Sequence, residues 1–105
     1  MKYKYGNYKD SQFQKYSQKI HARIHWLLIY AEKKDPILNQ YFELLQLELD
    51  GLNELLNYPV QIVQIQNLIE SARLEYTDPQ FSYKKYRQLI LDAHTVVDLL
   101  FGTKA

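Results

Sequence analysis

Apolar residues recur in steps of three and four along four stretches of this chain, and each short gap between neighbouring stretches contains a proline. The gaps are Asp35-Pro36, Tyr58-Pro59 and Asp78-Pro79. Such steps place apolar side chains on one face of an α-helix, and the residue before a proline is disfavoured inside a helix. The pattern therefore predicts one helical domain over residues 1–105, with helices near 10–33, 36–57, 60–76 and 79–101 and a flexible or loosely packed arm at 1–9.

Short connections force consecutive helices to lie antiparallel, so we expect an all-α, up-down-up-down four-helix bundle. Asp10, Asp35 and Asp78 are the expected N-caps, and Pro36 and Pro79 suit the first helical turn. Asn57 is the expected end of the second helix, although one kinked helix through Pro59 is an open alternative. The predicted core consists of Phe13, Tyr16, Ile20, Ile24, Leu27, Ala31, Leu38, Phe42, Leu45, Leu49, Leu52, Leu56, Ile62, Ile65, Ile69, Ala72, Tyr76, Tyr83, Tyr86, Ile90, Ala93, Val97 and Leu100.

Residues 60–66 alternate β-branched and polar side chains, a pattern that also suits a strand. A single strand among helices would have no strand to pair with, so we interpret this segment as helical.

The first two helices carry more apolar residues than one bundle core requires. Trp26 and Ile29 project away from the core face of the first helix, and Leu44, Leu47, Gly51, Leu55 and Tyr58 form a second stripe on the next. A glycine inside a helix is often tolerated because another backbone approaches closely. Exposed apolar patches usually mark an interface, and the predicted partner-binding residues are Trp26, Ile29, Leu44, Leu47 and Gly51. The alternative is an irregular bundle in which the second helix is central and buries both stripes.

Charge is distributed unevenly, although the net charge is only +1. Residues 1–34 carry a net +6 and residues 35–56 a net −5. The asymmetry can draw the first two helices together or attract an acidic partner. The absence of cysteine excludes disulfides, thiolate metal sites and cysteine nucleophiles, and it is typical of a cytoplasmic protein. No apolar run approaches the roughly 20 residues of a membrane span, and no cofactor motif is present, so we expect no cofactor.

Two segments interleave lysine with tyrosine, and such segments can bind single-stranded nucleic acid by base stacking and phosphate contacts. The second is Tyr83-Lys84-Lys85-Tyr86-Arg87, whose tyrosines also belong to the predicted core. The first is the N-terminal arm, with candidate residues Lys2, Tyr3, Lys4, Tyr5 and Lys9.

His21 and His25 are four residues apart and could present two imidazoles to a metal ion from one helical flank. No HExxH motif or cysteine completes a ligand set. The alternative is a partly exposed histidine pair that binds no metal.

Arg87 and His94 are separated by six residues and lie on one flank of the fourth helix. This spacing resembles the R-x4-6-H signature of HEPN domains, small helical bundles that often dimerise. In many members that arginine and histidine cleave RNA, so the resemblance implies an RNase in which His94 moves a proton and Arg87 stabilises the phosphorane charge. Asp98, four residues after His94, offers a purely structural alternative through an i,i+4 contact.

The predicted function is a non-enzymatic protein-binding module in the cytoplasm, acting as an inhibitor, an immunity protein or a scaffold. In size and expected fold the chain is similar to small immunity proteins against peptide bacteriocins and to phage-encoded inhibitors. The expected partner is a protein or a second copy in a homodimer. The HEPN-like RNase and single-stranded nucleic-acid binding are the alternatives.

Overall fold

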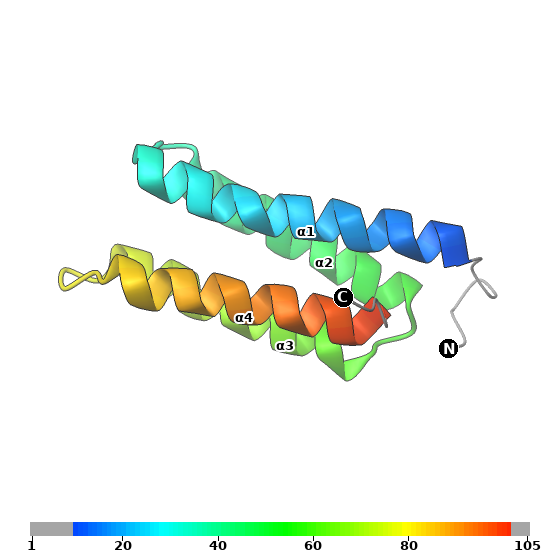
Figure 1. Cartoon of the computed structure of the whole chain (residues 1–105). Helices are drawn as coiled ribbons and strands as arrows, with labels where there is room; N and C mark the ends of the chain where they lie inside the picture. The colour runs from blue at the N-terminus through cyan, green and yellow to red at the C-terminus, as the bar shows by residue number, and fades with distance from the viewer. Residues whose placement is uncertain (1–9, 102–105) are drawn as a thin grey trace.

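The computed structural model describes residues 10–101, with side chains from Gln14 onward. Within this range the chain is all-helical, with no strand. The four helices lie side by side along the long axis of the molecule (Figure 1). They are α1 (Asp10–Lys33), α2 (Leu38–Leu55), α3 (Val60–Thr77) and α4 (Tyr83–Phe101). Residues 60–66 open α3, so the strand-like alternation there does not produce a strand. The arm at 1–9 lies outside the described residues.

The helices surround one apolar core. α3 and α4 pack together most extensively and α1 and α4 come next, and among helices consecutive in the chain α1 and α2 pack least. The predicted core residues are buried wherever their side chains are described, except that Tyr16, Tyr76 and Tyr83 are partly buried against the core. Leu28 joins the core as well, and the side chain of Phe13 lies outside the described part.

Residues beside the prolines explain the conformation of the first two connections. The Asp35 carboxylate accepts a hydrogen bond from the Ile37 backbone N–H at 3.0 Å. α2 begins only at Leu38, with Ile37 at its N-cap position, so Asp35 and Pro36 form the preceding turn and Asp35 is not the N-cap that was expected. After α2, Asn57 and Tyr58 adopt positive φ values of 64° and 61°. This left-handed conformation cannot continue a right-handed helix, so α2 and α3 are separate helices rather than one kinked helix.

The third connection also differs from the expectation, because Asp78 is not the N-cap of α4. Asp78 accepts the Gln80 backbone N–H on its carboxylate at 2.7 Å and the Phe81 N–H on its carbonyl at 3.0 Å, which closes a turn. α4 begins only at Tyr83, where the Ser82 hydroxyl accepts the Lys85 N–H at 3.4 Å. Asp78 therefore caps a turn, and Ser82 caps the helix. Aspartate followed by proline suits either arrangement, because both use the carboxylate as an acceptor for a nearby N–H.

No helix within residues 10–101 combines the length and the apolar character needed to cross a membrane.

Candidate functional site

The most exposed apolar residues of the predicted interface lie on α1 and α2. Trp26 is 42% exposed, Leu44 54% and Leu47 66%, while Gly51 is exposed and Ile29 is partly buried. α2 therefore does not bury its second stripe inside the bundle. The irregular arrangement in which α2 is central does not occur.

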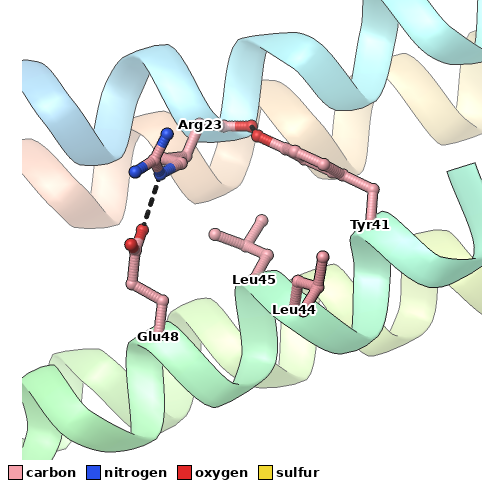
Figure 2. A pocket seen from close by; sticks show the side chains of 5 residues that line it. All are labelled: Arg23, Tyr41, Leu44, Leu45 and Glu48. Atoms are coloured by element: carbon pink, nitrogen blue, oxygen red, sulfur yellow. Dashed lines mark hydrogen bonds and ion pairs between the residues drawn. The ribbon is translucent and has the colours of Figure 1, made fainter. Parts of the chain in front are cut away.

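A pocket of about 320 Å³ opens where α1 meets α2, lined by Arg23, Tyr41, Leu44, Leu45 and Glu48. Figure 2 shows the leucines on α2 between Tyr41 and Glu48, with Arg23 reaching across from α1. The Arg23 guanidinium donates from Nε to Glu48 Oε1 at 2.8 Å, and the Tyr41 hydroxyl donates to the Arg23 carbonyl at 2.7 Å. These two contacts fix the rim of the pocket on both helices.

The electrostatics of the rim follow from these contacts. The hydrogen bond and the charge of Glu48 raise the pKa of the Arg23 guanidinium above its ordinary value. Burial raises the pKa of the Tyr41 hydroxyl to about 12, so this hydroxyl stays protonated and remains a donor. The pocket thus has an apolar wall and a charged rim, a combination suited to holding a side chain and orienting it.

An aromatic row continues from the pocket toward Trp26. The rings of Tyr30 and Tyr41 meet edge to face with centroids 5.1 Å apart, and the rings of Trp26 and Tyr30 lie 5.3 Å apart. Trp26 is therefore supported from one side while a large part of its surface stays exposed, as is typical of an interface anchor.

A second, smaller pocket of about 140 Å³ follows along the same seam, lined by Tyr16, Lys19, Ile20, Glu48, Gly51, Leu52 and Leu55. Glu48 borders both pockets. A Cβ atom added to Gly51 would meet no heavy atom within 4 Å. The expectation that a neighbouring backbone explains Gly51 is therefore wrong within this chain, since its outer side is open.

Leu47 lies apart from the other predicted interface residues. It lines a different pocket, of about 380 Å³ between α2 and α3, with Phe42, Glu43, Gln46, Glu70 and Arg73. The structure therefore gathers Trp26, Leu44 and Gly51 along the α1–α2 seam and places Leu47 toward α3. We call the seam surface, made of Lys19, Arg23, Trp26, Tyr30, Tyr41, Leu44, Glu48 and Gly51, the α1–α2 face.

The polar members of this face were not among the predicted site residues. Tyr41, Leu44, Glu48 and Gly51 follow one another in steps of three and four, so the helical period that selected Leu44 and Gly51 also contained Tyr41 and Glu48. Arg23 could have been found from its position between Lys19 and Trp26 on the opposite helix.

A histidine cluster joins α1 to α4 on another side of the bundle. The rings of His21 and His94 stack with centroids 4.9 Å apart, and their Nδ1 atoms are 2.7 Å apart. His21 Nε2 lies 2.8 Å from Asp98 Oδ1. Burial lowers the pKa of His94 to about 4, and the nearby His21 and His25 add to this effect against the opposing charge of Asp98.

Both ring nitrogens of His21 thus contact side chains on α4, while the predicted metal-site neighbour His25 is exposed on α1. Among the side chains that the structure describes, no group of three or more histidine, cysteine or acidic residues is arranged to hold a metal ion. The cluster instead connects two helices.

The residues of the RNase hypothesis lie in different environments. Arg87 is exposed, whereas His94 is partly buried and turned toward α1. Asp98, considered as an i,i+4 partner for His94, forms a hydrogen bond with His21, and its charge also acts on His94. RNA cleavage by Arg87 and His94 stays a prediction that these positions do not test.

The two segments proposed to bind nucleic acid also lie in different parts of the chain. Lys2, Tyr3, Lys4, Tyr5 and Lys9 lie outside the described residues. In the second segment, Tyr86 is buried and donates its hydroxyl to the Leu27 carbonyl at 2.7 Å, and Tyr83 donates to Glu32 Oε1 at 2.6 Å. These two tyrosines serve the packing of α4 against α1.

Comparison with family models, with curated proteins and with solved structures found no match to this chain.

Proposed function

We propose that this chain is a non-enzymatic protein-binding module that presents the α1–α2 face to a protein partner. The observation that carries the proposal is an exposed anchor, Trp26, connected through Tyr30 to the larger of two pockets on the loosely packed seam between α1 and α2. The module acts by occlusion or scaffolding, as an inhibitor, an immunity protein or a scaffold does, and it needs no reacting group.

The face has the composition of an interface centre with a polar rim. Trp26, Tyr30 and Leu44 provide aromatic and aliphatic surface, and Arg23 and Glu48 provide directed charges at the pocket edge. Aromatic and arginine side chains are the groups that contribute most to binding at protein interfaces. Because hydrogen bonds already fix Arg23 and Tyr41, little side-chain entropy is lost when a partner binds.

The proposal includes an up-down-up-down topology, supported by the short connections and by the packing of α1 against α4. It also includes a cytoplasmic location, supported by the absence of cysteine from the sequence.

The experiment is affinity capture from the native host with the tagged wild-type chain, followed by mass spectrometry and by binding to the purified candidate. Leu44→Asp should weaken binding of the captured protein at least tenfold, because a carboxylate would be desolvated at the apolar wall of the pocket. Leu99→Asp is the matched control, since Leu99 is 67% exposed on α4, away from this face.

Circular dichroism and thermal unfolding first establish that both variants fold. Equal binding by wild type, Leu44→Asp and Leu99→Asp would show that the α1–α2 face is not the binding surface. Loss of binding in Leu99→Asp alone would move the site to α4.

A further inference from the structure

The basic residues of α1 are gathered along the α1–α2 face. From Gln14 onward, every lysine and arginine of the helix lies on the ridge that borders this face. The ridge follows steps of three and four through Lys15, Lys19, Arg23, Trp26, Tyr30 and Lys33. The acid of α1 within this range, Glu32, lies on another flank, where it accepts the hydroxyl of Tyr83 on α4. The ridge is therefore basic along its whole length.

The opposite ridge, on α2, provides little negative charge. It runs through Tyr41, Leu44, Glu48, Gly51 and Leu55, and Glu48 is its one acid. The Glu48 carboxylate already accepts the hydrogen bond from Arg23, as Figure 2 shows. Glu43 and Asp50 lie toward α3, where Glu43 lines the pocket between α2 and α3 and Asp50 accepts the Gln66 amide. One ion pair is thus the whole charge contact across the seam between residues 14 and 101.

The remaining positive charge of the face is therefore not neutralised by the described chain. Lys15, Lys19 and Lys33 are exposed, and none of them forms an ion pair within residues 14–101. Lys19 also lines the smaller pocket, so one of these charges lies directly beside an apolar recess. A partner that covers the face must accommodate these ammonium groups, and carboxylates do so most favourably.

The seam between the two ridges supplies two apolar recesses. Leu45 lines the larger pocket and Leu52 the smaller one, and both side chains are buried. These leucines are seven residues apart, which is about 10 Å along a helix. An amphipathic helix presents apolar side chains at the same i, i+7 spacing. A second helix laid along the seam can therefore place one apolar side chain in each pocket.

We infer that the segment that occupies the α1–α2 face is an acidic amphipathic helix of another protein. Its apolar side chains enter the two pockets, and its carboxylates lie over Lys15, Lys19 and Lys33. This inference rests on the proposed function and states the chemistry of the partner. Opposite charges across the interface speed the encounter, and a helix with lysine on that flank is repelled.

A nucleic acid would use the same lysines but not the rest of the face. Glu48 borders both pockets, so its carboxylate would lie beside a phosphate backbone that followed the seam. The leucine walls of the pockets offer no hydrogen-bond donor to a phosphate or a sugar. The combination of lysines with apolar recesses therefore favours a protein helix.

The single tryptophan of the chain makes binding at this face observable, because Trp26 lies on it and is 42% exposed. Two synthetic helices of about five turns are compared. Both lack tryptophan and carry the same leucine stripe, and the flank beside the stripe holds glutamate in one and lysine in the other. In low salt the glutamate helix should change the Trp26 emission and bind about tenfold more tightly than the lysine helix.

Charge reversal on α1 provides the matched test. Lys15→Glu with Lys19→Glu should weaken binding of the glutamate helix about tenfold. Lys84→Glu with Lys85→Glu makes the same change of charge at exposed positions of α4 and should alter the affinity by less than about twofold. Circular dichroism establishes that both variants fold. If the reversal unfolds α1, Lys15→Gln with Lys19→Gln replaces it and should weaken binding about threefold.

Equal affinity for the two helices, or no change of Trp26 emission with the glutamate helix, would overturn the acidic partner. A change of emission with a single-stranded oligonucleotide and none with the glutamate helix would identify nucleic acid as the occupant. The first two results would leave the proposed function standing if Leu44→Asp still weakened binding of the captured protein. Equal binding of that protein by wild type and Leu44→Asp is instead the failure of the proposed function itself.

Discussion

At the scale of single residues, the contact between His21 and His94 constrains where protons can sit. With the two Nδ1 atoms 2.7 Å apart, one must donate and the other accept. A proton on both atoms would set two N–H groups against each other. Helices α1 and α4 therefore stay joined here only while one of the two Nδ1 atoms remains unprotonated.

This constraint predicts a loss of stability in mild acid. Because the pKa of His94 is about 4 in the folded chain, below its ordinary value of 6.5, the unfolded chain binds this proton first as the pH falls. The contribution of His94 to stability is complete above pH 6.5 and is lost toward pH 4. The free energy of unfolding, measured in urea, should fall by about 2 kcal/mol between pH 7 and pH 5.

The matched variant His94→Gln lacks the titrating group and keeps a polar side chain of similar size. Between pH 7 and pH 5 the free energy of unfolding of this variant should fall by about 2 kcal/mol less than that of the wild type. An equal loss in both proteins would show that other groups cause the acid sensitivity.

Two tyrosine hydroxyls that donate to α1 carbonyls should contribute unequally to the free energy of unfolding. The Tyr86 hydroxyl is buried and donates to the Leu27 carbonyl, whereas the Tyr41 hydroxyl makes a more exposed bond to the Arg23 carbonyl. Tyr86→Phe should lower the free energy of unfolding by about 1 kcal/mol, and Tyr41→Phe by clearly less, since water can replace that bond. Urea titration of both variants checks the order, and a larger loss in Tyr41→Phe would contradict it.

At the scale of helices, the sequence predicted the buried faces and the gaps between helices, because the local pattern of residues determines both. Steps of three and four identified the buried faces, and the prolines marked the gaps. The start of α4 could not be predicted, because Asp78 and Pro79 are as well suited to a turn as to a helix N-terminus. Contacts with α1, such as the hydrogen bond from Tyr83 to Glu32, show where α4 docks.

The glycine within α2 gives a test at this scale. Its surroundings are empty within the chain, so a methyl group there meets nothing. Gly51→Ala should raise the free energy of unfolding by about 0.5 to 1 kcal/mol through helix propensity, measured at a concentration low enough to keep the chain monomeric. A destabilised variant would mean that α2 is not a regular helix at this point.

At the scale of the whole molecule, the limits of the sequence lie in contacts between distant segments. His21 and His94 are 73 residues apart, and nothing in their local patterns pairs them. The sequence did predict that Trp26 and Leu44 lie outside the core, because each helix defines its own buried face. The sequence did not predict that Leu47 lies on a different surface from Trp26 and Leu44, because the direction in which α3 packs on α2 places Leu47 toward α3.

The helices pack against their neighbours to different extents, and this predicts the order in which they open locally. α2 packs least extensively against its neighbours, while α3 and α4 form the tightest pair. In hydrogen exchange at low concentration, the amides of α2 should exchange faster than those of α3, because local opening requires less free energy where fewer contacts are broken. Equal protection of α2 and α3 would contradict this order.

The same experiment with the captured partner bound connects the packing to the proposed function. A partner on the α1–α2 face would cover the weakest seam between consecutive helices, so protection should rise in α1 and α2 and stay unchanged in α3, which lies outside the interface. A rise in all helices together would mean that opening is global, and a rise confined to α3 would place the partner on the opposite side. The α1–α2 seam, which is loosely packed in the single chain, is then the one that partner binding stabilises most.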